Sequence, residues 1–444
     1  MPRSRRFTSL VATGLAATLM LAACGGGTED EGGPDAEGRT SLDMWVFAEL
    51  HETFYEKMAE QWNKENPDRP VDLKVTVYPY DDMHNKLQLA VNSGKGLPDL
   101  VDIEVNQFSN FVGEGGKSPL SDLGAAAEPY KKDIVQARLD LYTRDGVIRG
   151  FPTHVGAFVA FYNTPLLEKA GIDYKSIKTW QDFQEAGAAY NKATGKAFGV
   201  ASTGVNMVEN LMVAQLGGSL FAEDGSVQVD SPEVVEALEM EKAMQDAGAI
   251  STIPGGSPDA EEAYGAINDG KYAAIVYPAW YTSRFVDYMP DLKGDIAIAP
   301  APVVDNPEVA TIGGGGTGTA VPEASPNKEF AQEFLAFAKL SPEANVAVWE
   351  VLGFDPVNMS VWTDKKVTHN PDNRFNKYFQ TNLFDVLNKV KGDIGHFESF
   401  TNPNLPAVDD QFTTVTYTEI FENGVPPKEA LAQAQSDLEN QIGE

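Results

Sequence analysis

The order of strand-like and helix-like patterns between residues 41 and 104 constrains the fold more than any other feature of this chain. The strand-like runs are Leu42–Phe47, Val71–Val77 and Leu100–Ile103. Two helical patterns separate these runs, one with apolar residues at Phe54, Met58 and Trp62 and one over Met83–Asn92. Strands that alternate with helices in this order form a largely parallel sheet covered by helices, so we predict an α/β fold.

A second unit is expected from about Phe151 to Pro302. It contains helical patterns near 182–192 and 232–247 and a strand-like run at Tyr272–Tyr277. A helix follows Ser325-Pro326-Asn327, and the C-terminal residues after Pro427 carry an apolar helical stripe. With 444 residues, the chain is long enough for about three average domains or two large ones.

The charge of the chain excludes several classes of partner. Asp and Glu total 65 against 34 Lys and Arg, which gives a formal net charge of −31. Binding to nucleic acid requires a basic surface, so no nucleic-acid partner is expected. The single cysteine, Cys24, excludes an intramolecular disulfide, a CxxC redox pair and a cysteine-based zinc cluster.

That cysteine follows a leader-like N-terminus. Arg3, Arg5 and Arg6 precede an apolar run from Leu10 to Ala23 that is too short to span a membrane but suits a secretory signal. The run ends in LAAC, which resembles the bacterial lipobox. We therefore predict that residues 1–23 are removed, that Cys24 is acylated, and that the Gly- and acid-rich residues 24–40 form a flexible tether. A plain signal peptide followed by a chance cysteine is the alternative.

Motifs for cofactors and catalysis are weak. The run GGGGTG at 313–318 formally matches GxGxxG, but no helix pattern follows it, so a nucleotide role is not expected. The five His form no spaced pair, and neither a metal nor another cofactor is predicted. Chance pairs of carboxylates are plentiful among 65 acids, so a membrane-anchored glycoside hydrolase stays open as an alternative. Release of reducing ends from oligosaccharides would distinguish it from a binding protein.

Aromatic residues next to acids, amides and histidine follow several predicted strands. The residues concerned are Trp45, Glu49, Asp82, Glu104, Asn106, Gln107, His154, Trp280 and Tyr281. Ligands of open α/β sheets bind at the carboxyl ends of strands. Aromatic rings pack on sugar rings, and carboxylates and amides bond to hydroxyl groups. Each residue also has a structural alternative, such as a core position for Trp45 and Trp280, or a helix N-cap or solvated acid for Asp82.

Several blocks of the sequence resemble the extracellular solute-binding proteins, family 1, of carbohydrate ABC importers. They are GLPDLVDIE at Gly96–Glu104, the segment Gly146–Asp173, Lys178-Thr179-Trp180, the segment Tyr277–Pro302, and ASPNKEFAQEFLAFA at Ala324–Ala338. The stretches ELHETFYEKMAEQWN, YPYDDMHNKL and WEVLGFDPVN are similar to arabinose or arabino-oligosaccharide binders of Gram-positive bacteria.

The resemblance implies a two-lobed periplasmic-binding-protein-like fold of type II, with a mostly parallel sheet in each lobe and a ligand cleft between the lobes. Lobe one would hold 41–153 plus 303–342, and lobe two 154–302 plus 343–444. Crossings would then fall near Pro152–Gly156 and Ala299–Val304. The resemblance also adds Gly314 and Asp355 to the expected ligand-binding residues.

The same resemblance implies a binding protein rather than an enzyme. We expect a monomer that binds a sugar or oligosaccharide and delivers it to the transmembrane subunits of an ABC permease. It would lie on the extracytoplasmic face of the cell membrane, attached to the membrane by its lipid anchor alone.

Overall fold

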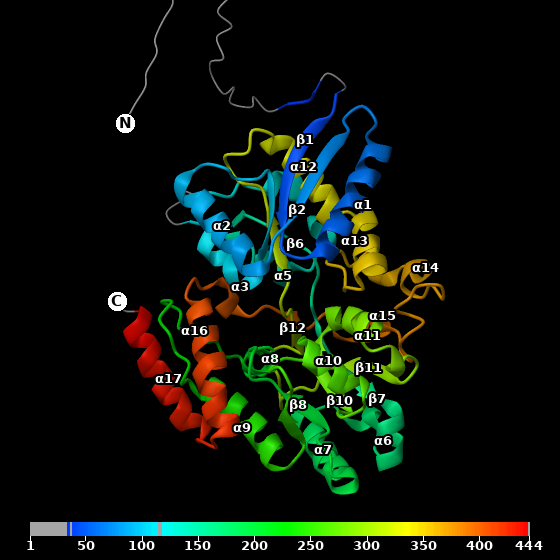
Figure 1. Cartoon of the computed structure of the whole chain (residues 1–444), viewed down its shortest axis with the longest axis vertical. Helices are drawn as coiled ribbons and strands as arrows, with labels where there is room; N and C mark the ends of the chain where they lie inside the picture. Colours follow the sequence, from blue (N-terminus) through cyan, green and yellow to red (C-terminus); the bar gives the residue numbers. More distant parts are fainter. Residues whose placement is uncertain (1–32, 36–37, 114–117, 443–444) are drawn as a thin grey trace, which may run out of the picture.

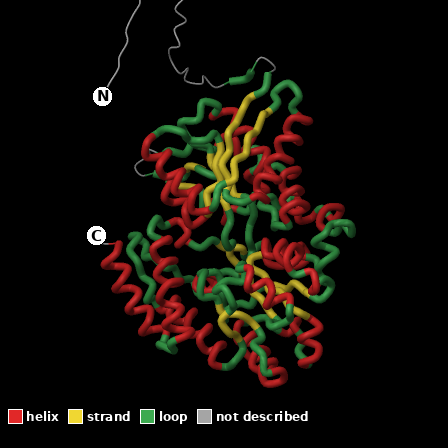
Figure 2. Tube along the Cα trace, in the orientation of Figure 1, coloured by secondary structure: helices red, strands yellow, loops and turns green. Residues whose placement is uncertain are grey.

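The computed structural model describes residues 33–35, 38–113 and 118–442. The predicted leader, Cys24 and most of the predicted tether lie outside these residues. The described chain forms two α/β lobes stacked along the long axis of the molecule (Figure 1). Figure 2 shows the strands in two separate groups, one in each lobe, with helices around them.

The first lobe is built on a five-stranded sheet in the order β2-β1-β3-β13-β6. The strands are β1 (Thr40–Val46), β2 (Val71–Val77), β3 (Leu100–Glu104), β6 (Phe151–Pro152) and β13 (Thr317–Ala320). β1 is parallel to both β2 and β3, whereas β13 runs antiparallel between β3 and β6. The largely parallel sheet predicted for this lobe is therefore confirmed.

Helices cover this sheet through apolar faces that the sequence pattern predicts. The longer helices are α1 (Glu49–Glu65), α2 (Tyr80–Ser93) and α12 (Lys328–Leu340). Trp62 of α1 makes edge contacts with Phe334 and Phe337 of α12, at ring-centroid distances of 5.8 and 5.5 Å. The shorter elements are α3 (Val105–Phe108), α4 (Gly124–Ala127), α5 (Gln136–Asp140), β4 (Thr143–Arg144), β5 (Val147–Ile148) and α13 (Pro342–Ala347).

The main sheet of the second lobe corrects one expectation. It holds β7 (Phe158–Asn163) between β10 (Ala274–Pro278) and β11 (Ile296–Pro300), and β7 is antiparallel to both neighbours. A mostly parallel sheet was the prediction for this lobe. Every residue of β7 and β10 is buried, so both strands are continuous apolar runs whose pattern carries no information about direction.

Helices around these strands complete the core of the second lobe. They are α6 (Thr164–Ala170), α7 (Trp180–Thr194), α8 (Val208–Gln215), α9 (Pro232–Asp246), α10 (Glu261–Asn268), α11 (Thr282–Tyr288), α14 (Lys365–Thr368) and α15 (Leu383–Val390). Short parallel pairs join β8 (Gly199–Ala201) to β9 (Ile250–Thr252) and β12 (Thr311–Ile312) to β14 (Ile394–Gly395). Near the C-terminus, α16 (Leu405–Gln411) continues into π-helical turns, and α17 (Pro427–Ile442) packs against α9.

The chain passes between the lobes at residues 153–157 and again at 313–316. The first passage agrees with the crossing expected near Pro152–Gly156, because β6 belongs to the first sheet and β7 to the second. The second passage differs from the expected Ala299–Val304. Val303 is still bonded to residues 178–180 of the second lobe, and β12 pairs with β14 there. Pro300 and Pro302 therefore mark the end of β11 and not a change of lobe.

The third passage also differs from the expected boundary at 343. Helix α13 packs on α12 of the first lobe, and Asn358 still forms a bridge with Ile134. The chain is in the second lobe by Gln380, whose N–H donates to the carbonyl of Ile296. Helix α13 and Asn358 thus remain with the first lobe, while the carbonyl of Gly353 between them accepts a hydrogen bond from Thr282 of the second lobe.

Candidate ligand-binding cleft

A cavity of about 650 Å³ lies where the two lobes face each other. Its lining residues are Tyr80, Asp81, Glu104, Val105, Asn106, Gly204, Val205, Asn206, Met207, Asn210, Gly315, Phe400, Asp409, Asp410 and Thr413. The first lobe supplies the end of β3 and the start of α2, and the second supplies the start of α8 and helix α16. Carboxylates, amides and aromatic rings face the cavity, and no Lys or Arg of the described residues lines it.

Glu104 forms the wall of the cavity at the carboxyl end of β3. Its Oε2 accepts a 2.9 Å hydrogen bond from the N–H of Asn106 and so caps α3. Its own N–H donates to Nε2 of His84, whose Nδ1 lies 2.8 Å from the carbonyl of Tyr80. His84 therefore carries its proton on Nδ1. Burial raises the pKa of Glu104 to about 7, against the opposing effect of the backbone N–H groups.

Gly315 brings the backbone of the second passage to the cavity. A Cβ at this position would lie 3.6 Å from Nε1 of Trp280, 3.7 Å from Cε of Met207 and 3.9 Å from Oε1 of Glu104. Its φ of +65° lies in the left-handed region, which glycine adopts without strain. The glycine run predicted to allow close backbone approach therefore does so, between the two lobes.

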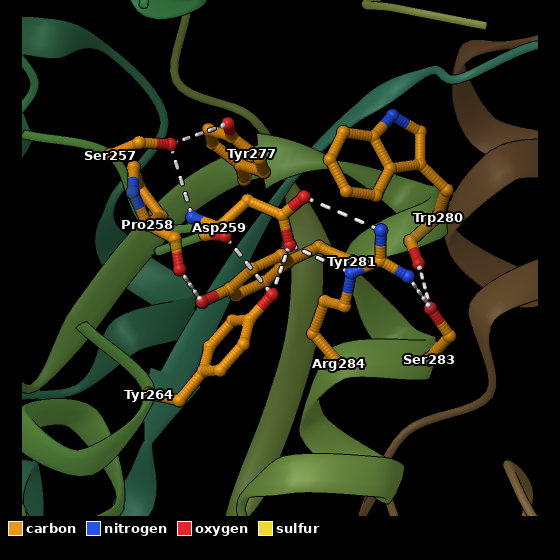
Figure 3. A network of polar contacts seen from close by, with 9 residues as sticks. All are labelled: Ser257, Pro258, Asp259, Tyr264, Tyr277, Trp280, Tyr281, Ser283 and Arg284. Carbon is orange, nitrogen blue, oxygen red and sulfur yellow. Dashed lines mark hydrogen bonds and ion pairs between the residues drawn. The ribbon is translucent and has the colours of Figure 1, made fainter. Parts of the chain in front are cut away.

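Trp280 stands at the edge of this site and is 9 % exposed. Its Nε1–H donates a 2.9 Å hydrogen bond to the carbonyl of Gly314. The Arg284 guanidinium lies over its ring at 5.3 Å, and Asp259 holds that guanidinium through bonds of 2.7 and 3.3 Å (Figure 3). Tyr264 donates to the same Asp259 carboxylate (Figure 3). This network fixes the orientation of the indole.

Two of the residues predicted from the sequence line the cavity, and two more adjoin a lining residue in the chain. Glu104 and Asn106 line it. Gly314 and Asp82 are each the direct chain neighbour of a lining residue. A Cβ on Gly314 would come within 2.6 Å of the Phe158 ring, so this position requires glycine for packing as well.

Three predicted residues of the first lobe are outside the lining. Trp45 is buried under α2, where its ring meets Tyr78 edge-on at 5.6 Å and Lys86 Nζ lies 4.8 Å from the ring centroid. Glu49 is exposed in the first turn of α1, and Gln107 is half-buried on α3. The core alternative considered for Trp45 matches its position.

His154, Tyr281 and Asp355 are buried behind the cavity. Tyr281 donates a 2.6 Å hydrogen bond to the carbonyl of Pro258. Asp355 accepts from the N–H groups of residues 156 and 157, at 2.9 and 2.8 Å, and burial raises its pKa to about 7. His154 lies in the first passage, and burial lowers its pKa well below the usual value. Asp355 thus holds the backbone of the first passage, whereas Tyr281 is bonded within the second lobe, and none of the three residues lines the cavity.

The structure adds residues that sequence reasoning missed. Tyr80 lies in the stretch YPYDDMHNKL, next to the acids already considered, so its position could have been noticed. Asn206, Phe400 and Asp409 come from a loop, a 3₁₀ turn and a helix of the second lobe. No local motif marks these residues, because only the tertiary fold brings them to the cavity.

The described residues hold no group of three or more His, Cys, Asp or Glu that could bind a metal ion. A search of the same residues found no helix long and apolar enough to cross a membrane.

Comparisons with known proteins agree with this architecture. The family model "Bacterial extracellular solute-binding protein" matches residues 47–345. The chain is 38 % identical to the arabinooligosaccharide-binding protein of Bacillus subtilis over 95 % of this chain and 96 % of that protein. It is 39 % identical to the protein of the same name from Halalkalibacterium halodurans, over 92 % and 91 % of the two chains.

Solved structures share the fold at low sequence identity. The sugar-binding protein MalE from Xanthomonas citri has a TM-score of 0.76 at 17 % identity, covering 91 % of this chain and 98 % of its own. The GacH receptor of Streptomyces glaucescens has a TM-score of 0.70 at 21 % identity, with the same coverage. Together, the two lobes, the cleft between them and these similarities show that the chain belongs to the bacterial extracellular solute-binding protein family.

Proposed function

We propose that this protein binds an arabino-oligosaccharide in the cleft between its lobes and delivers it to the permease of an ABC importer. Binding of sugar without catalysis follows from its family and from relatives that are binding proteins. The observation that carries the choice of sugar is the similarity to two arabinooligosaccharide-binding proteins over more than nine-tenths of each chain.

The chemistry of the cleft supports a neutral ligand rich in hydroxyl groups. Glu104 and the amides of Asn106, Asn206 and Asn210 offer hydrogen-bonding groups to ligand hydroxyls. Among the residues that the structure describes, no Lys or Arg that would favour an anion is part of the lining. Tyr80 and Phe400 supply aromatic surface against which a sugar ring can pack.

We further propose that the two lobes close on the ligand as rigid bodies. The passages at 153–157 and 313–316 contain glycines with positive φ, namely Gly156, Gly315 and Gly316. Closure around a ligand allows a partner to recognise the occupied state. The transmembrane subunits of an ABC permease are the partner that this role requires.

A lipid anchor at Cys24 completes the proposal. It would hold the protein on the outer face of the cell membrane, with residues 24–40 as the tether. The basic and apolar leader followed by LAAC supports this part.

A thermal-shift screen tests the choice of sugar. Arabino-oligosaccharides of increasing length would be compared with arabinose, malto-oligosaccharides and xylo-oligosaccharides. A ligand at 100 times its Kd adds about 2.7 kcal/mol to the free energy of unfolding, which such a screen detects. Stabilisation by arabino-oligosaccharides above the other sugars is expected. Stabilisation by malto-oligosaccharides alone would contradict the assignment.

A further inference from the structure

One carboxylate bonds to both lobes across the cleft. Asp409, on α16 of the second lobe, accepts a 3.1 Å hydrogen bond from Nδ2 of Asn106 on α3 of the first lobe. Its other oxygen accepts a 2.7 Å bond from Nδ2 of Asn206, in the loop before α8. Asn206 therefore orients the carboxylate within the second lobe, and Asn106 attaches it to the first lobe.

The carboxylate also fixes how the two amides are turned. An ionised carboxylate only accepts hydrogen bonds, so both amides direct their NH₂ groups toward Asp409. Burial raises the pKa of Asp409 to about 6, while the two amide donors oppose this rise, so the group is ionised at neutral pH. Each amide then has its Oδ1 atom turned away from the carboxylate.

Those two Oδ1 atoms are unsatisfied. Both are buried, and neither Asn106 Oδ1 nor Asn206 Oδ1 has a hydrogen-bond partner among the residues that the structure describes. Both residues line the cavity, and Asn206 is only 6 % exposed. A buried acceptor without a donor is unfavourable, so this arrangement favours a ligand that donates hydrogen bonds to both oxygens.

A neighbouring contact holds the same surfaces together. Oγ of Ser109 donates a 2.9 Å hydrogen bond to the carbonyl of Thr401, and Nη2 of Arg144 donates to the same carbonyl at 3.2 Å. Residues 401–409 of the second lobe are thus bonded to the first lobe at two places. This second contact limits how far Asp409 can shift relative to Asn106.

We propose that Asn106, Asp409 and Asn206 form an interlobe clasp that stabilises the closed cleft, and that their two free amide oxygens accept hydrogen bonds from ligand hydroxyl groups. The identity of the ligand as a sugar rests on the proposed function, but the clasp itself does not. Asp409 is a positioning residue in this account, because it acts through the two amides.

Hydrogen–deuterium exchange of the purified, ligand-free full chain tests the clasp. Asp409→Asn keeps the size of the side chain but can no longer accept from both amides. We expect exchange in residues 104–110 and 205–210 to become at least about fivefold faster, because the first segment loses its bond across the cleft and the second loses its bond to the same carboxylate. Asp437→Asn makes the same charge change on exposed α17 and should leave both segments unchanged. Faster exchange confined to residues 405–416 would overturn the proposed clasp, because it would show that Asp409 stabilises only its own helix.

A second variant tests the clasp from the first lobe. Asn106→Ala removes the first-lobe partner and leaves α16 intact. It should accelerate exchange at 205–210, on the other side of the cleft. Unchanged exchange there would contradict the proposal, even if Asp409→Asn had destabilised its own helix.

Calorimetric titration with an arabino-oligosaccharide tests the role of the two oxygens. Asp409→Asn should raise Kd about tenfold or more, since one amide is free to turn its NH₂ group into the cavity. An unchanged Kd in this variant would overturn the assignment of the oxygens. If the unmodified protein binds none of these sugars while exchange at 104–110 rises in the variant, the proposed ligand is wrong and the clasp stands.

Discussion

Arg138 donates a 2.7 Å hydrogen bond from Nη2 to the carbonyl of Gly315 and so links a buried cation to the wall of the cleft. Arg138 is 1 % exposed and lies on α5 of the first lobe, whereas Gly315 lies in the second passage between the lobes. The charge of Arg138 also lowers the pKa of Glu104 and of Asp355 against the larger effect of burial. One side chain therefore supports both the second passage and the wall of the cavity.

Replacement of Arg138 by Met should reduce stability. Met fills much of the volume but leaves the Gly315 carbonyl without its donor and two buried carboxyl groups without a cation. We expect the free energy of unfolding, measured by urea titration at neutral pH, to fall by about 2–4 kcal/mol. Arg69→Met removes an exposed ion pair with Glu333 and should cost less than about 1 kcal/mol. Equal stability of Arg138→Met and the unmodified protein would show that Arg138 does not support the second passage.

Two buried carboxyl groups make stability depend on pH. Glu209 of α8 and Glu241 of α9 are 3 % and 2 % exposed, and burial raises the pKa of both. Repulsion from Glu209 raises the pKa of Glu241 further. The folded state therefore keeps protons that the unfolded chain loses above its ordinary pKa of 4.5. Their contribution to stability is fully present below pH 4.5 and is lost as pH rises through the raised pKa values.

Glu241→Gln should remove part of this dependence. The variant is expected to be more stable than the unmodified protein at pH 8, by on the order of 1–3 kcal/mol, and about equally stable at pH 4.5. Glu239→Gln, an exposed neighbour on the same helix, serves as the control and should leave the pH profile unchanged. Thermal unfolding between pH 4.5 and pH 8 provides the comparison. A Glu241→Gln profile that runs parallel to that of the unmodified protein would refute this interpretation.

Trp280 should affect both binding and stability. Trp280→Ala is expected to weaken sugar binding by about 1.5–3 kcal/mol, or roughly 10- to 150-fold in Kd, if its ring packs on the ligand. Trp280→Phe keeps an aromatic face and loses the bond to Gly314, so stability should fall by about 1 kcal/mol. Its Kd should change less than that of the Ala variant. Calorimetric titration and melting curves separate the two effects, and unchanged affinity in Trp280→Ala would remove this residue from the site.

Membrane attachment should depend on Cys24. Cys24→Ala removes the thiol that carries the proposed lipid, so the protein should move from the membrane fraction to the medium. Thr28→Ala, in the adjacent tether, should remain with the membrane. Immunoblots of the two fractions provide the measurement. Retention of Cys24→Ala on the membrane would show that the lipobox interpretation is wrong.

Local sequence patterns predicted residues 40–104 well, because the strands and helices there follow one another and most of them have one buried face. The run Val71–Val77 is β2 residue for residue, and the spacing of Phe54, Met58 and Trp62 matches the buried face of α1. The direction of β7 could not be predicted, since a strand buried on both faces has no alternation and is followed by a long excursion before β10.

The site was predictable only where ligand-facing residues directly follow a strand. Glu104 was found because it ends β3, a position where α/β sheets bind ligands. Asp409 follows Asn106 by 303 positions and lies within a helix, and no local pattern connects the two. Asp355 was expected at the ligand, but its carboxylate is used by the backbone of the first passage.

The most direct test of this account is calorimetric titration of the protein and of Glu104→Gln with an arabino-oligosaccharide. Glu104 accepts a bond from Asn106 N–H and faces the cleft, and Gln keeps its shape while removing its charge. We predict saturable binding with one site per chain, and a Kd that rises by roughly 10-fold in Glu104→Gln without a lower melting temperature. Absence of binding to the unmodified protein, or identical affinity in the variant, would contradict the account.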